Sequence, residues 1–446
     1  MIQKMIAFFL FVVAVSFPIE HKYDRLFSKF SRSLIQKNLD LPSWFDYKIF
    51  FYASDLLLLV AAFFSMRALL RNKFATPLHV AIGWIVLSLL LSPLGHYIIP
   101  YLRVAHLLTA LIFFSLLVEY GSQLIRPIFY GVIVMALFQS FVAIGQYIVQ
   151  APLGLRIFSE PKVFASIATP DGMRWCFDRI ANESFALIIR PSGTFPHANV
   201  LGGYLCMSVL LTLHLFSKRL QGAWAAALCI QIFALFLTYS RSALFALLIG
   251  ALLFFALYIK QRYPWRQGAF TLIISILGST FVLLTPLTHR GGVVGSAPLA
   301  QASNQFRITH QQIAYNMIEK NPFFGVGYGR YPIEAPSFLP LETELPAGNS
   351  ATHNIYLLLA SEAGLPALFA FLTFIALILY RAFVAIQSHT TIALLSIFIA
   401  FLFIGGCDFY LLLFQQGRLM FFLIAGLLAA QRGSRQISLI SLSIAP

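Results

Sequence analysis

Apolar stretches long enough to cross a bilayer recur along almost the whole of this 446-residue chain. About 17 to 25 apolar residues span the hydrocarbon core as a helix, because a helix satisfies its own backbone hydrogen bonds. About twelve candidates lie at residues 1–17, 49–66, 76–94, 98–119, 124–150, 198–216, 223–239, 242–259, 268–286, 353–380, 390–411 and 416–431. With only 11% charged residues, the chain also lies outside the range of soluble domains. We therefore expect an all-α polytopic membrane protein, with residues 1–446 forming a single integral membrane domain.

The first apolar stretch has two readings. Its core, Ile6–Phe17, is short for a span, and Ala14-Val15-Ser16 is typical of a signal-peptidase site. Residues 1–17 are therefore either a membrane span or a cleaved signal, and the orientation of the later helices is the same in both cases.

Charge in the short loops predicts a cytoplasmic N-terminus. On that assumption, the cytoplasmic side is almost purely basic and carries Arg67, Arg71, Lys73, Arg126, Lys218, Arg219, Lys260, Arg262, Arg266, Arg381, Arg432 and Arg435, with Glu119 as its acid. The opposite side mixes both signs of charge. The net charge of +15 therefore reflects membrane topology and contact with anionic membrane lipid, and we expect no nucleic-acid partner.

Three extramembrane stretches are long enough to have structure, and all are predicted on the non-cytoplasmic side. Residues 18–48 have the pattern of an amphipathic surface helix. Residues 151–197 and 287–352 form loops that are too apolar for disorder. Within the second loop, Asn304–Lys320 has helical periodicity and ends at Asn321-Pro322, before a tight turn at residues 323–329.

Four ionisable residues interrupt the apolar pattern where stretches meet: Arg190, Arg241, Arg307 and His353. Ionisable groups are costly near hydrocarbon, so several on one side indicate a binding or reaction site. Three of them also have a simpler reading, and that of His353 is a polar helix cap. Arg241 is equally placed to extend toward headgroups from a helix end, and Arg307 to be a solvated residue at the start of the loop helix.

His353 opens the helix that follows the long loop, with Thr352 and Asn354 as candidate caps. A helix N-terminus disfavours the imidazolium, which would leave a neutral imidazole suited to general-base work. His310 lies one turn after Arg307 on the same helix face. Glu362 is about 13 Å deeper than His353, and we favour a structural acid over a second proton acceptor.

The remaining residues do not suggest a cofactor. Cys206, Cys229 and Cys407 lie in apolar spans, Cys176 lies in a loop, and no Cys-x-x-Cys or His/Cys cluster is present. We expect no disulfide, no metal and no cofactor.

Four segments in order, RPSGTFPHANVLGGYL, TYSRSAL, an arginine followed by NPFFGVGYGRY, and THNIYLLLASEAGL, resemble the motifs of the O-antigen ligase and polymerase superfamily. The resemblance covers residues 186–385. It implies about a dozen helices, with a large periplasmic loop between two late spans, in the bacterial inner membrane. It also implies inverting, metal-independent transfer of a glycan from an undecaprenyl-diphosphate carrier to a hydroxyl acceptor.

The resemblance assigns roles to individual residues. Arg241 and Arg307 would hold the diphosphate, with Arg190 as a third cationic contact, and His353 would lie at the acceptor hydroxyl. The candidates for supporting residues are His197, Asn199, His310, Asn354 and Glu362. Similar proteins often carry an aromatic residue near the position of His310, which leaves the register around Arg307 open.

Elementary chemistry is consistent with these roles. A polyprenyl diphosphate leaving group gains negative charge as the glycosidic bond breaks, and guanidinium groups bind phosphate oxygens bidentately. The competing class is a transporter of an anionic solute. That class needs charged groups near the bilayer midplane, where the spans offer only Asp55, Glu362 and Asp408.

The acceptor is the least determined part of the prediction. Ligation to lipid A–core, polymerisation of O-antigen repeat units and glycosylation of a protein hydroxyl share one donor chemistry. The moderate loop length and the lack of a large C-terminal soluble domain favour a ligase or a polymerase, and we choose the ligase with lipid A–core as acceptor.

Overall fold

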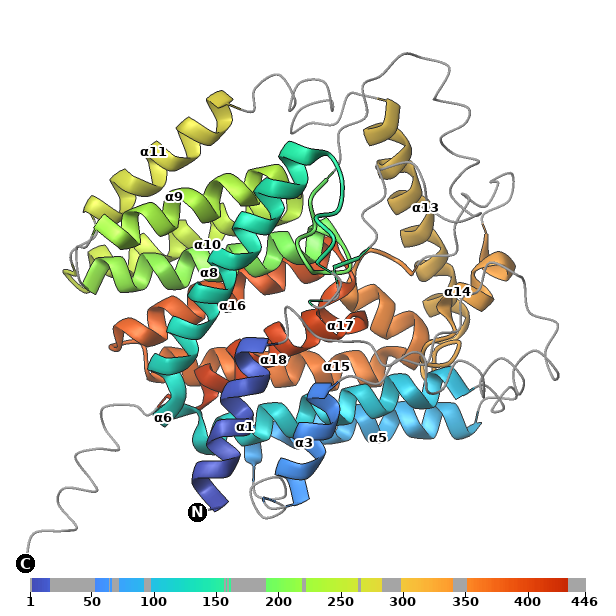
Figure 1. Cartoon of the computed structure of the whole chain (residues 1–446). Helices are drawn as coiled ribbons and strands as arrows, with labels where there is room; N and C mark the ends of the chain where they lie inside the picture. The colour runs from blue at the N-terminus through green and yellow to red at the C-terminus, as the bar shows by residue number, and fades with distance from the viewer. Residues whose placement is uncertain are drawn as a thin grey trace, which may run out of the picture.

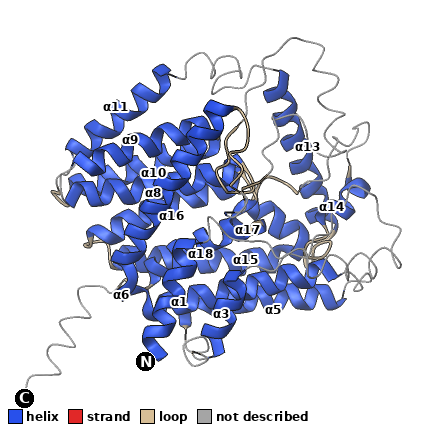
Figure 2. Cartoon of the chain, viewed as in Figure 1, coloured by secondary structure: helices blue, strands red, loops and turns tan. Residues whose placement is uncertain are grey.

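The computed structural model describes residues 2–16, 53–63, 65, 72–91, 98–155, 158, 160–161, 190–218, 222–263, 266–282, 298–339 and 351–431. These residues are mostly helical and contain no strand (Figure 2). The predicted surface helix at 18–48 and most of the loop at 151–197 lie outside them. So do residues 283–297 and 340–350 of the second loop.

Long apolar helices dominate the described part of the chain (Figure 1). Their bounds are α1 Ile2–Ser16, α3 Ala53–Phe63, α5 Thr76–Leu91, α6 Ile98–Val149, α8 Ala198–Lys218, α9 Gly222–Leu237, α10 Arg241–Lys260, α11 Arg266–Val282, α15 Ile355–Val384, α16 His389–Cys407 and α18 Gln415–Ala429. Shorter pieces are η2 Lys73–Ala75, α14 Tyr331–Glu334, η4 Ala335–Phe338 and α17 Tyr410–Leu413, and the loop helix α13 is Pro298–Lys320.

The all-helical, multi-pass membrane architecture is confirmed at this level. Six helical segments in the described residues are long and apolar enough to cross a membrane, and four apolar helices are shorter. The predicted count of about twelve spans is not confirmed. Two of the predicted spans, 98–119 and 124–150, lie within one helix, α6, which contains Pro127. Proline removes a backbone donor and bends a helix, and Figure 1 shows α6 changing direction between its cyan and teal parts.

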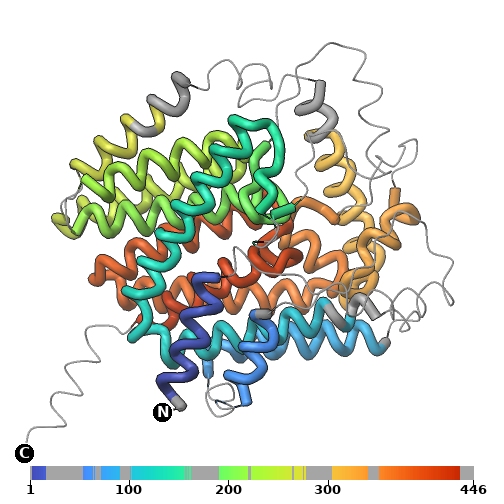
Figure 3. Tube along the Cα trace, viewed as in Figure 1, coloured from blue at the N-terminus to red at the C-terminus, as the bar shows by residue number. Residues whose placement is uncertain are grey.

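The helices pack in groups around α8, whose side chains are buried almost throughout. Helix α8 contacts α9, α10 and α16, while α10 packs along α16 and α18 packs along α6. Small residues permit the close approaches: a Cβ at Gly203 would lie 2.0 Å from the Tyr410 hydroxyl oxygen. The chain trace in Figure 3 shows α13 set apart from the α8–α11 group, leaning over the end of α15, with which it makes contact.

Helix α15 is interrupted near its start, and a loop fills the gap. Gly364 has φ of 84°, a conformation that favours glycine. The turn at 322–327 then supplies the missing partners: the Leu365 amide donates to the Pro322 carbonyl (2.7 Å), and the Val326 amide to the Ser361 carbonyl (2.9 Å). Within a membrane-spanning helix, irregular backbone is tolerated only where other protein groups satisfy its hydrogen bonds. The predicted tight turn at 323–329 is therefore part of the packing of α15.

The loop helix extends further than predicted. It begins at Pro298, so Arg307 lies within α13 and not at its start, which corrects the sequence interpretation. Of the apolar positions on its periodic face, Ile313 and Met317 are fully buried, whereas Phe306 and Ile318 are half-buried. The helix ends at Lys320, before Asn321-Pro322, as predicted.

Candidate functional site

The segment before α8 places Arg190 against two other segments of the chain. Its Nε donates to the Thr238 carbonyl (2.9 Å), and Nη2 donates to Oδ1 of Asn199 (2.6 Å). Thr238 is three residues before Arg241, so this contact joins the two arginine-bearing segments. The backbone amide of Asn199 also donates to Nδ1 of His197 (3.1 Å).

The second and third arginines meet through the loop helix. Arg241 is the first residue of α10, and its Nη2 donates to Oδ1 of Asn304 on α13 (3.0 Å). Arg307 follows Asn304 by three residues, which places both on one face of that helix. The Arg307 guanidinium is close enough to Arg241 for their charges to interact. No hydrogen bond or ion pair joins Arg307 to another residue in the described part of the chain, so its donors remain available.

His353 lies among aromatic rings, within electrostatic range of Arg307. Its ring centroid is 5.9 Å from that of Phe306 and 4.7 Å from that of Phe409. Burial is the main cause that lowers the pKa of His353, and together with the nearby charges of Arg307 and His310 it brings the pKa to about 3. The imidazole is therefore neutral because of burial, and not because of the helix N-terminus that the sequence analysis invoked. Nδ1 is buried without a hydrogen-bond partner among the described residues.

The start of α15 shows why His353 is held at this point. Asn354 is the N-cap, and its side chain accepts from the backbone amides of Tyr356 (2.9 Å) and Leu357 (3.0 Å). Of the two candidate caps, Thr352 and Asn354, the structure thus uses Asn354. His353 precedes the N-cap residue and takes no part in its hydrogen bonds.

An acid that the sequence interpretation did not assign to the site completes the arrangement. Asp408 follows α16 and accepts from Nδ2 of Asn199 through Oδ2 (2.7 Å). Asn199 therefore bridges Asp408 and Arg190. Asp408 had been considered only as a charged group in a span. No sequence pattern distinguished it, because its partner lies 209 positions away.

These contacts link the predicted site residues into one closed cycle of contacts, which we call the ring. Arg190 is joined to Thr238, Arg241 to Asn304, Phe306 to His353, Phe409 to His353 and Asp408 to Asn199. His197, which is exposed, lies within electrostatic range of Arg190, Asp408, His353 and Arg307. The starts of α8, α10 and α15 also converge here, and helix N-termini favour anions. The arrangement can bind an anionic group beside a neutral imidazole.

Two predicted supporting residues lie behind this ring. His310 is fully buried, its ring is 4.3 Å from that of Phe306, and its Nδ1 is 3.3 Å from the Tyr331 hydroxyl. Burial lowers the pKa of His310 to about 4. Glu362 is also fully buried, accepts from the backbone amide of Tyr331 (3.1 Å) and lies 3.5 Å from Nη1 of Arg103. Its other oxygen, Oε2, is buried without a hydrogen-bond partner among the described residues, and the structural role of Glu362 stays a prediction.

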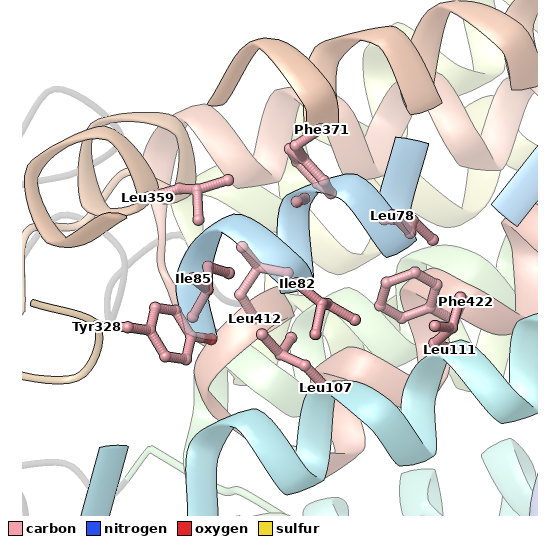
Figure 4. Close-up of a pocket in the computed structure, with 11 residues that line it drawn as sticks. Leu78, Ile82, Ile85, Leu107, Leu111, Tyr328, Leu359, Phe371, Leu412 and Phe422 are labelled. Carbon is pink, nitrogen blue, oxygen red and sulfur yellow. The ribbon is translucent and has the colours of Figure 1, made fainter. Parts of the chain in front are cut away.

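An apolar cavity lies outside the ring (Figure 4). Its lining comes from α5, α6, α15, α17 and α18, together with Tyr328: Leu78, Ala81, Ile82, Ile85, Leu107, Leu111, Leu359, Phe371, Leu412 and Phe422. None of the predicted site residues is among them. As to metals, no group of three or more His, Cys, Asp or Glu residues in the described ranges is arranged to hold an ion.

The comparisons with known proteins agree with the motif resemblance. Residues 224–372 match the family model described as O-antigen ligase, a range that includes Arg241, Arg307 and His353. The match supports membership of the O-antigen ligase superfamily and a ligase- or polymerase-type activity of a multi-pass membrane protein. It implies a lipid-linked glycan donor and a lipid acceptor. No curated protein matches the chain.

Proposed function

We propose that this protein transfers an O-antigen glycan from undecaprenyl diphosphate to a hydroxyl of lipid A–core, in the bacterial inner membrane and with its site facing the periplasm. The observation that carries the proposal is the ring of contacts that links the segments bearing Arg190, Arg241, Arg307 and His353. The family match supports it independently, because it covers three of these four residues.

The donor diphosphate binds to the cationic side of the ring. Arg307 makes no hydrogen bond or ion pair with another described residue, and the guanidinium of Arg241 is oriented by Asn304. As the bond from the anomeric carbon to the phosphate oxygen breaks, negative charge grows on that oxygen. Arg190 and Arg241 stabilise it with little rearrangement, since hydrogen bonds to Asn199 and Asn304 already orient them. They perform the charge neutralisation that a divalent cation supplies in other transferases.

His353 accepts the proton of the acceptor hydroxyl. The hydroxyl oxygen attacks the anomeric carbon from the face opposite the diphosphate, which inverts the configuration, and the His353 imidazole receives the proton. A base with a pKa of about 3 is weak. At an effective dielectric constant of about 20, one negative charge about 6 Å away raises a pKa by about 2 units. A bound diphosphate therefore makes His353 a stronger base when the donor is in place.

The test is the surface glycan profile of the native host after deletion of this gene, together with the lipid-linked pool. A ligase leaves lipid A–core without polymer and full-length polymer on the carrier. A polymerase instead leaves single repeat units on the core. An unchanged profile refutes the proposal and directs attention to glycoproteins, and then to transport of an anionic solute.

A point variant tests the chemistry within the same strain. His353→Ala should abolish transfer at an unchanged protein level. His79→Ala is the matched control, because His79 is an exposed histidine on α5 outside the ring. Normal glycan transfer by His353→Ala would rule out His353 as the proton acceptor.

A further inference from the structure

Two buried glutamines on α6 have no part in the chemistry proposed above. Gln139 and Gln146 are fully buried in the second half of an apolar helix. They are seven residues apart, two helical turns, and so lie on one face. A buried carboxamide costs free energy unless its donors and acceptor are satisfied. Apart from Glu160, the hydrogen-bond partners of both side chains lie in the segment that follows Arg190.

Gln146 uses the whole hydrogen-bonding capacity of its side chain. Oε1 accepts from the backbone amides of Ser192 (3.1 Å) and Gly193 (2.9 Å). Nε2 donates to the Gly193 carbonyl (2.9 Å) and to Oε1 of Glu160 (2.8 Å). A primary carboxamide has two donors and two acceptor lone pairs, so none is left over.

Gln139 holds the next residue of the same segment. Oε1 accepts from the Thr194 amide (2.9 Å), and Nε2 donates to the Thr194 hydroxyl (2.8 Å). The backbone here fits only glycine between the two contacts. Gly193 has φ of 60°, and a Cβ on it would lie 2.4 Å from Oε1 of Gln139.

Residues 192–194, which the two glutamines contact, lie directly beside the candidate site. Arg190 is two residues before Ser192, and Asn199, which Arg190 contacts, is five residues after Thr194. Tyr147, the residue after Gln146, contacts the segment that carries Arg241. The Tyr147 hydroxyl is 3.2 Å from that of Tyr239, which precedes Arg241 by two residues. The second half of α6 thus contacts the segments that carry both arginines.

We infer that Gln146 and Gln139 are positioning residues that set the place of Arg190 in the donor site. The inference rests on the proposed function, because Arg190 matters there only as a diphosphate contact. The two glutamines touch no reacting group and act through the backbone of residues 192–194. Rigid support of this kind lowers the entropic cost of ordering Arg190 when the donor binds.

The sharpest variant is Gln146→Glu, which keeps the shape of the side chain. One carboxylate oxygen still accepts from Ser192 and Gly193, but the other faces the Gly193 carbonyl and the Glu160 carboxylate, both acceptors. We expect the KM for the lipid-linked donor to rise at least tenfold at neutral pH, with the KM for the acceptor unchanged. A carboxyl group beside Glu160 has a raised pKa, and its protonated form donates again. Donor KM should therefore recover as the pH falls.

The control is Gln231→Glu, at a fully buried glutamine on α9 whose Oε1 is 3.2 Å from the Thr212 hydroxyl, away from the ring. That variant should affect stability without a pH-dependent donor KM. An unchanged donor KM in Gln146→Glu, or the same pH dependence in Gln231→Glu, overturns the inference.

Two further measurements separate this inference from the proposed function. Geranylgeranyl diphosphate binding to the wild-type protein tests the donor site itself, and absence of binding contradicts the proposed function. Amide hydrogen exchange at residues 192–194 tests the support independently of any activity. It should become at least tenfold faster in Gln146→Ala. Unchanged exchange would refute the positioning role even if the protein is a transferase.

Discussion

His310 offers the clearest quantitative test of the packing behind the candidate site. The imidazole is fully buried, and burial lowers its pKa to about 4. In the unfolded chain it returns to about 6.5. Because the folded-state pKa is lowered, the unfolded state binds the proton first as the pH falls. The stability present above pH ~6.5 is therefore lost progressively toward pH ~4.

The size of this effect follows from the two pKa values. At about pH 5, the unfolded imidazole is almost fully protonated and the folded one is mostly neutral, which costs about 2 kcal/mol relative to pH ~7.5. His310→Phe removes the titrating group and keeps a ring beside Phe306. The substitution also removes the contact with the Tyr331 hydroxyl, which is worth about 1 kcal/mol. In the opposite direction, it removes the desolvation cost of Nε2, which is buried without a hydrogen-bond partner among the described residues.

The assay is the thermal unfolding of purified protein in detergent between about pH 5 and pH 7.5. Near pH 7.5 the two proteins should unfold within about 1 kcal/mol of each other, and near pH 5 the variant should be about 2 kcal/mol more stable relative to the wild type. His79→Gln, on an exposed face of α5, should leave the pH dependence unchanged. The reasoning is refuted if wild type and His310→Phe lose stability equally on acidification. Transfer activity of His310→Phe also decides whether His310 replaces a packing aromatic, in which case activity persists.

Three further predictions follow from individual contacts. Gly364→Ala should prevent accumulation of folded protein, because residue 364 has a positive φ and a Cβ there would lie 1.9 Å from the Phe323 carbonyl oxygen. Gly222→Ala is the control and should leave the melting temperature unchanged, because a Cβ at residue 222 meets no atom within 4 Å. Asn199→Leu removes the bridge between Arg190 and Asp408 and should slow transfer about 10- to 100-fold at an unchanged protein level, since a hydrogen bond to a charged group is worth about 1.5–3 kcal/mol. Arg241→Lys loses the fork that contacts Asn304 and should raise donor KM about tenfold with acceptor KM unchanged; equal kinetics would show that charge alone suffices.

Local patterns predicted the elements of this protein well. Hydropathy indicates membrane helices because their burial in lipid requires apolar residues over a fixed length. The periodicity of Asn304–Lys320 predicted the buried face of α13, and Asn321-Pro322 marked its end. The motifs around Arg190, Arg241, Arg307 and His353 were visible because each interrupts an apolar run. Element boundaries were less reliable: α13 begins earlier than predicted, and α6 continues through Pro127.

The sequence by itself determined the class of the protein and the residue types at its candidate site. Only the tertiary structure decided which residues meet there. Asp408 reaches Arg190 through Asn199, and Gln139 and Gln146 reach residues 192–194, across 46 to 209 positions of the chain. Such contacts leave no local signal, because a hydrogen bond between distant residues constrains neither periodicity nor hydropathy near either one. Lipid solvation selects the helices along the chain, whereas the pairing of buried polar groups selects how those helices come together.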